Sequence, residues 1–77
     1  MDTTGRHPGT VAVTRWFGWE HLLPDLQPIS KGCHDLAEQM LQRIPDDPEL
    51  VIGLRHLLDA KDAFVRAAIA ARAGTDG

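Results

Sequence analysis

Apolar residues recur at steps of three and four along the middle of the chain, which is the spacing of a stripe on one face of an α-helix. The stripe consists of Leu26, Ile29, Cys33, Leu36, Met40 and Ile44. It predicts a helix over about residues 28–44, starting within about three residues of Pro28, because proline fits a first helical turn but not a helix interior.

A second apolar stripe follows a clear helix start. Asp47 precedes Pro48 and Glu49, which gives a capping side chain, a proline at the first helical position and an acid in the first turn. The predicted helix covers about residues 48–71, only about three or four residues after the first, so we expect antiparallel helices. Its apolar positions are Val51, Leu54, Leu58, Val65, Ala68 and Ile69, flanked by Leu50, Leu57 and Phe64.

The apolar face of the second helix is wider than one partner helix can cover. Leaving half of its large side chains in water would forfeit about 1.5–3 kcal/mol for each, and a chain of 77 residues has little stability to spare. We therefore expect copies to associate. The predicted fold is all-α: an antiparallel two-helix hairpin with a short N-terminal aromatic segment or helix, assembled into a compact homo-oligomeric helical bundle.

The ends of the chain differ in composition from its middle. Residues 1–10 are rich in Gly, Thr and Pro, so residues 1–12 are expected to form a flexible N-terminal segment. Val11, Ala12 and Val13 are too short a run for a strand signal and are predicted to be a loop. The helical hairpin domain is expected to span residues 13–72, and residues 73–77 to form a flexible C-terminal tail.

Charge, hydropathy and cysteine content limit the possible binding partners and the cellular compartment of the protein. Eleven acidic and eight basic residues give a net charge of −3, which argues against binding to extended nucleic acid. No apolar run approaches the roughly 20 residues that cross a bilayer, and the first residues lack the order of a signal peptide. Cys33 is the only cysteine, so no disulfide forms within one chain and Cys33 is expected in the core. A reducing, cytoplasmic setting fits best.

The sequence contains no evident catalytic constellation. Asp46 and Asp47 fit a turn and a cap, and there is no Gly-rich phosphate loop. No histidine stands three or four residues from another, the spacing that places two imidazoles on one helix face, so no metal site is expected. The histidines are His7, His21, His34 and His56. We therefore expect neither an enzyme nor a cofactor.

The segment at residues 15–21 reads Arg-Trp-Phe-Gly-Trp-Glu-His and holds three of the four aromatic residues. Aromatic faces beside Arg15 suit stacked, phosphate-bearing ligands. Alternatively, Trp16, Phe17 and Trp19 form an apolar lid over the open end of the hairpin. Lys61 interrupts the second stripe and should point to the apolar side, either along an interface between copies or as a ligand or intersubunit ion-pair residue.

The order of these features resembles a phage protein family. The matching stretches are residues 15–22, 26–31, 34–40 and 53–69, of which residues 61–68, Lys-Asp-Ala-Phe-Val-Arg-Ala-Ala, are the most specific. Over residues 14–70 the chain resembles the small helical-hairpin proteins with which bacteriophages sequester cyclic nucleotide signals. These are the anti-CBASS sponge and the hairpin part of the anti-Thoeris sponge.

The resemblance implies a homo-oligomer, a hexamer in the anti-CBASS branch, that binds cyclic oligonucleotides in the host cell cytoplasm without cleaving them. Cyclic dinucleotides in that family lie between protomers, where an aromatic residue stacks on a base and a lysine meets phosphate. In this chain the stacking role falls to Trp16 or Trp19, near Arg15, and the phosphate contact to Lys31 or Ser30.

The same resemblance implies a separate pocket for cyclic trinucleotides, for which Arg66 is the matching residue. Two other functions remain open. One is a helical adaptor that binds a protein through residues 16–19, without a nucleotide ligand. The other is a small nucleic-acid regulator, which the acidic balance disfavours.

Overall fold

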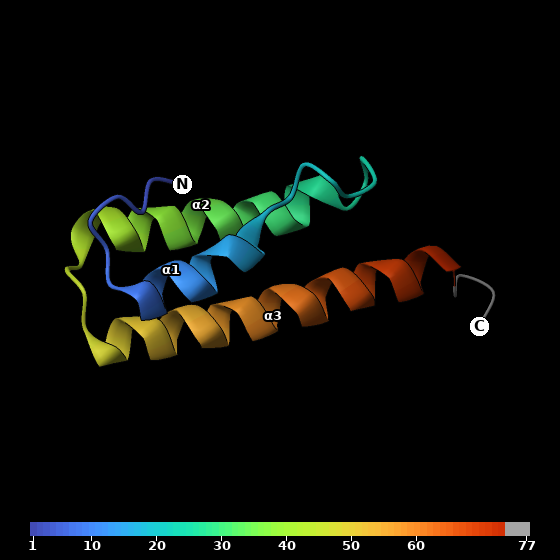
Figure 1. Ribbon diagram of the computed structural model, residues 1–77. Coiled ribbons are helices and arrows are strands. Elements are labelled where there is room, and N and C mark those ends of the chain that lie inside the picture. Colours follow the sequence, from blue (N-terminus) through green and yellow to red (C-terminus); the bar gives the residue numbers. More distant parts are fainter. Residues whose placement is uncertain (74–77) are drawn as a thin grey trace.

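The computed structural model describes residues 1–73, and over that range it contains helices and no strands (Figure 1). The elements are α1 (Pro8–Thr14), the 3-10 turn η1 (Arg15–Phe17), α2 (Gln27–Arg43) and α3 (Pro48–Ala73). The prediction of an all-α fold is confirmed for this part of the chain. Both long helices begin within one residue of their predicted starts, because proline and capping signals mark those starts.

Residues 44–47 link the two long helices, and Figure 1 shows the chain turning back there so that α3 runs opposite to α2. Asp47 Oδ1 accepts a hydrogen bond of 2.8 Å from the backbone N–H of Glu49. The predicted cap of α3 is therefore present. Of the predicted tail, residues 73–77, only Ala73 is described, as the last residue of α3; the others lie outside the described residues.

The prediction of a loop at residues 11–13 is wrong, because these residues belong to α1. Pro8 occupies the first turn, and His7 Nδ1 accepts a hydrogen bond of 2.9 Å from the N–H of Gly9. The side chains buried along α1 and η1 follow helical steps of three and four residues. They are Thr10, Val13, Thr14 and Phe17. Two of these four are threonines, so a search for apolar residues alone misses the periodicity.

The segment formed by α1 and η1 lies between α2 and α3 (Figure 1). Phe17 is fully buried, and Leu54 of α3 is 2 % exposed. The core joins residues of all four elements: Val13, Phe17, Cys33, Ala37, Leu41, Leu50 and Leu54. Cys33 is a core residue, as expected. Part of the wide apolar face of α3 is therefore covered by the N-terminal segment of the same chain.

Polar contacts hold the residues before α1 against the end of α2. The Arg6 guanidinium donates to the carbonyl oxygens of Leu41 and Ile44, the latter at 3.0 Å. Asp46 accepts from the N–H of His7 at 2.8 Å, the hydroxyl of Thr10 at 3.0 Å and Arg6 at 3.2 Å. Residues 6–12 are thus part of the fold rather than the flexible segment expected from their composition.

The described helices form one compact body, elongated along α3, with extents of 47 × 21 × 18 Å. Several large apolar side chains remain exposed in the single chain. Phe64, Trp16 and Leu23 are 59 %, 58 % and 56 % exposed, and Ile69 is 45 % exposed. None of the helices in residues 1–73 combines the length and apolar character that a bilayer crossing requires.

Candidate functional site

The three aromatic residues of the segment at residues 16–19 have different surroundings. Phe17 is fully buried in the core, Trp16 is largely exposed, and Trp19 is half-buried. In a 3-10 turn successive side chains point about 120° apart, so Trp16 and Phe17 of η1 cannot share one environment. An apolar lid made of all three residues is therefore wrong, and the two indoles remain as candidates for ligand contact.

Trp19 and Lys31 come together although they lie in different segments. The Nζ atom of Lys31, in the second turn of α2, is 5.6 Å from the ring centroid of Trp19, which is within the range of a cation–π contact. Lys31 Nζ also donates to Asp35 Oδ2, one helical turn away, at 2.8 Å. The structure therefore brings together one predicted stacking residue and one predicted phosphate contact.

A second indole–cation pair lies on η1. The guanidinium carbon of Arg15 is 5.3 Å from the ring centroid of Trp16, and both side chains are exposed. The carbonyl oxygen of Trp16 accepts a hydrogen bond of 2.8 Å from Lys61 Nζ. This bond connects η1 to the middle of α3 and fixes the backbone that carries the indole.

Lys61 does point toward the body of the molecule, as the interruption of the apolar stripe predicts, with its side chain 12 % exposed. Its partners belong to the same chain, namely the Trp16 carbonyl and Asp62, whose Oδ1 is 3.4 Å from Nζ. The described contacts thus give Lys61 a role within one chain, and its expected role at an interface or ligand site stays a prediction. Burial raises the pKa of the neighbouring Cys33 thiol, against the smaller opposite effect of the Lys61 ammonium.

Ser30 does not face solvent. Its residue is fully buried and its hydroxyl has no hydrogen-bond partner. Adjacent residues of an α-helix point about 100° apart, so Ser30 turns to the core while Lys31 turns to the surface. The assignment of a phosphate contact to Ser30 is wrong in this arrangement, and Lys31 is the accessible residue of the two.

Arg66 lies apart from the indole–cation pairs, on α3. It lines a crevice of about 270 Å³ between α3 and the connection that precedes α2, where His21 and Lys61 also contribute. The remaining lining residues are Leu22, Asp62 and Val65. Two cations and a histidine therefore border one small opening, together with the Asp62 carboxylate, which lies 3.4 Å from Lys61 Nζ.

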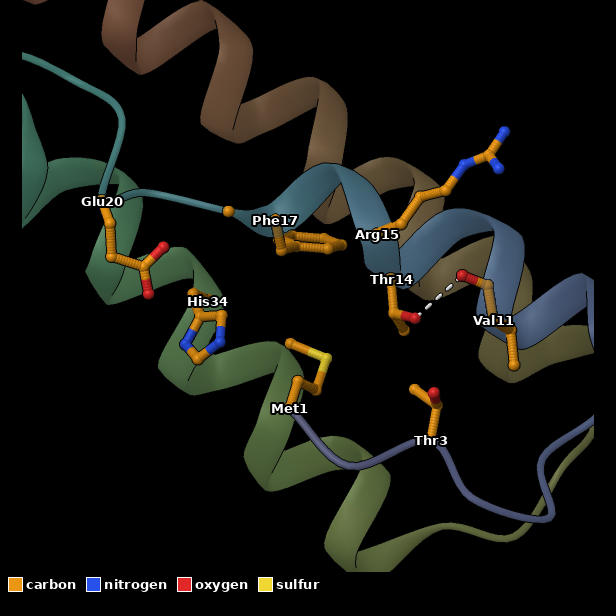
Figure 2. A pocket seen from close by; sticks show the side chains of 9 residues that line it. Met1, Thr3, Val11, Thr14, Arg15, Phe17, Glu20 and His34 are labelled. Carbon is orange, nitrogen blue, oxygen red and sulfur yellow. Dashed lines mark hydrogen bonds between the residues drawn. The ribbon is translucent and has the colours of Figure 1, made fainter.

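A cavity of about 350 Å³ opens between the N-terminal residues, η1 and α2 (Figure 2). Figure 2 shows the carboxylate of Glu20 turned toward the imidazole of His34, with Met1 beside it and the Arg15 guanidinium pointing away. On its rim, Thr14 Oγ1 donates to the carbonyl of Val11 at 3.0 Å.

A cluster of groups that could bind a metal ion lies beside this cavity and was not predicted from the sequence. One ligand atom from each of His34, Asp35 and Glu38 lies within 4.8 Å of the other two. Lys31, and after it His34, lower the pKa of Asp35 by hydrogen bonding to its carboxylate. The signal in the sequence is the four-residue step from His34 to Glu38, which places both side chains on one helix face. It was overlooked because only pairs of histidines were considered.

Comparison of the chain with protein-family models, with curated proteins and with solved structures gives no significant match. These comparisons therefore add no relative from which a function could be proposed.

Proposed function

We propose that this chain is a phage anti-defence protein that binds host cyclic oligonucleotide signals and withholds them, intact, from the effectors that they activate. The observation that supports this most directly is the Lys31–Trp19 pair, with 5.6 Å between Nζ and the ring centroid. It offers an aromatic face for a base and a cation for a phosphate. The resemblance to phage sponges supplies the class of ligand and the place of action, the cytoplasm of the host cell.

In the proposed complex a base stacks on Trp19 or Trp16, and Lys31 or Arg15 meets the adjacent phosphate. Stacking on an aromatic side chain contributes about 1–3 kcal/mol per base, and a charge-assisted hydrogen bond about 1.5–3 kcal/mol. Lys31 exchanges its bond to Asp35 for the phosphate, so its net contribution is smaller than this gross value. Contacts to two bases and two phosphates give enough binding free energy for tight binding if the pocket is formed before the ligand arrives.

We also propose that the two-helix hairpin formed by α2 and α3 is the building unit of a homo-oligomer, with a hexamer as the expected state. The exposed apolar side chains support association, because burying each would contribute about 1.5–3 kcal/mol. The largest exposed fractions are those of Trp16, Leu23 and Phe64. In such an assembly the cyclic dinucleotides lie at the seams between copies.

Arg66 is proposed to serve cyclic trinucleotides. Together with His21 and Lys61 it borders a separate crevice of about 270 Å³, which suits part of a phosphate-bearing ring shared between copies. Replacing Arg66 by Ala should weaken trinucleotide binding more than dinucleotide binding, and equal losses would contradict two distinct pockets.

Binding without cleavage requires neither a nucleophile nor a general base, because sequestration acts by stoichiometry. Native mass spectrometry of the protein mixed with a panel of cyclic di- and trinucleotides tests this directly. We expect saturable binding, a defined subunit count, and recovery of the unmodified ligand after heat denaturation. Recovery of a linear product would indicate an enzyme instead.

Matched variants identify the stacking residue. Trp19→Ala should lower the affinity for a cyclic dinucleotide by about 5–150-fold, the equivalent of about 1–3 kcal/mol, without changing the sedimentation coefficient of the oligomer. Trp16→Ala is the parallel test for the other indole. Arg55→Ala replaces an exposed cation on α3 and should leave the affinity unchanged. If both tryptophan variants merely unfold the chain, the stacking assignment is wrong.

A helical adaptor that binds a host protein is the second candidate. The exposed indole of Trp16, together with Leu23, offers apolar surface for a protein partner. This function is preferred if calorimetry shows no heat with any cyclic nucleotide while a specific host protein binds through Trp16.

A further inference from the structure

One turn of α2 carries a histidine and two carboxylates close to one another. His34 and Glu38 stand four residues apart and so share a helix face, and Asp35 reaches both of them. All three residues are half-buried, and the side chain of His34 is 17 % exposed. An imidazole nitrogen with two carboxylate oxygens is a donor set that suits Zn²⁺ and related divalent transition metals.

One of the three distances already fits a single ion. Zinc binds nitrogen and oxygen at about 2.0–2.2 Å, so two of its ligand atoms stand roughly 3.0–3.6 Å apart. His34 Nδ1 and Asp35 Oδ1 are 3.1 Å apart. The carboxylate of Glu38, within 4.8 Å of both, approaches by turning about its flexible side-chain bonds.

Neighbouring side chains hydrogen-bond to the candidate ligands and would hold them in place. Asp35 offers Oδ1 to His34, while its other oxygen, Oδ2, accepts a hydrogen bond of 2.8 Å from Lys31. Carboxylate ligands of metals are typically oriented by hydrogen bonds of this kind. Glu20 comes from a different segment and lines the same cavity as His34. Its carboxylate faces the imidazole in Figure 2, but Glu20 is not among the three residues whose ligand atoms lie within 4.8 Å of one another.

From this geometry we propose that His34, Asp35 and Glu38 bind one divalent transition-metal ion per chain, with Zn²⁺ as the best fit and water completing the coordination. The site revises the expectation of no metal, which considered only pairs of histidines. It goes beyond the proposed nucleotide function but shares Lys31 with it, because Lys31 is the proposed phosphate contact and also hydrogen-bonds Asp35.

Titration of ZnCl₂ into chelator-stripped protein, followed by isothermal calorimetry, tests the site. We expect one ion per chain. His34→Ala and Glu38→Gln should each weaken binding at least about tenfold. The control is the double variant of His56→Ala with Asp59→Asn, which removes an exposed histidine and carboxylate three residues apart on α3 and should leave the affinity unchanged.

Two further measurements make the test independent of folding defects. Far-UV circular dichroism verifies that each variant keeps its helices, and Asp35→Asn provides a third ligand variant of nearly unchanged size. Absorption of the Co²⁺-loaded protein should lack a thiolate charge-transfer band, because the neighbouring Cys33 is buried.

Any of three results would overturn the proposal. The first is the absence of saturable Zn²⁺ binding up to about 1 mM. The second is a loss of affinity in the α3 control as large as in the α2 variants. The third is a thiolate band in the Co²⁺ spectrum, which would assign the ion to Cys33.

Discussion

Replacing Arg6 by Ala tests whether the residues before α1 are part of the fold. The Arg6 guanidinium reaches the carbonyl oxygens of Leu41 and Ile44 at the end of α2, where the last carbonyl groups have no partner within the helix. It also meets Asp46 at 3.2 Å, and its side chain is 18 % exposed. The substitution therefore removes the cation that caps α2 and that joins two segments distant in sequence.

The size of the effect follows from the two carbonyl contacts. A hydrogen bond to a charged group contributes about 1.5–3 kcal/mol, and two bonds from one guanidinium are not additive, so we expect a loss of about 2–3 kcal/mol. The whole chain of 77 residues is expected to have about 4–12 kcal/mol of stability. At about 4–8 °C per kcal/mol for a domain of this size, Tm should fall by about 8–24 °C.

Urea denaturation followed by circular dichroism at one protein concentration measures the change, because association makes stability depend on concentration. Arg55→Ala removes an exposed arginine of α3 and should stay within about 0.5 kcal/mol of the parent. Arg6→Lys keeps the charge but lacks the planar fork, so it should fall between the parent and Arg6→Ala. A loss in Arg6→Ala no larger than that in Arg55→Ala would refute the capping role.

Two further predictions concern single side chains. Ser30→Ala removes a buried hydroxyl that has no hydrogen-bond partner and introduces a better helix former. The free energy of unfolding should therefore rise by about 1 kcal/mol, while ligand affinity stays unchanged. A fall in the urea midpoint would contradict this. The pKa of Asp46 is lowered first by the backbone hydrogen bond from His7, with smaller contributions from Thr10 and Arg6. The stabilisation by Asp46 is therefore complete above the unfolded value of about 3.9 and is lost as the pH falls through the lowered folded value. Urea midpoints between about pH 7 and about pH 2 should drop more steeply in the parent than in Asp46→Asn, and equal slopes would argue against the contact.

The two long helices were predictable because each carries its own start signal and its own apolar stripe. Asp47 caps α3 as the sequence indicates, and this local chemistry requires no knowledge of the rest of the fold. α1 was not predictable in the same way. Thr10 and Thr14 are buried although threonine is usually exposed, and a helix of this length forms only through tertiary packing.

The wide apolar face of α3 indicated that α2 alone could not cover it. The sequence prediction assigned the remaining cover to other copies of the chain and did not foresee the N-terminal segment. Val13 and Phe17 of the N-terminal segment cover the first part of α3, so fewer side chains are left for other copies than the sequence implied. Phe64 and Ile69, farther along α3, remain exposed. Self-association stays a prediction that concerns this second half of the helix.

The candidate site shows a similar division. The pairing of Trp19 with Lys31 joins two residues that the resemblance to phage sponges singled out, without any knowledge of their positions in the fold. Choosing between Ser30 and Lys31 as the phosphate contact requires knowing which face of α2 points to the core. In the structure that face contains Ser30, which is buried. A shift of one residue in helical register reverses such an assignment, and no local signal fixes it.

The position of α1 and η1 between the long helices has a consequence for synthesis on the ribosome. Val13 and Phe17 leave the exit tunnel first, but their packing partners include Leu50 and Leu54 of the last helix. The nascent chain therefore cannot complete this core until Leu50 and Leu54, in the first two turns of α3, have left the tunnel. Until then Val13 and Phe17 are expected to lack their packing partners on α3 and to expose apolar surface on the nascent chain.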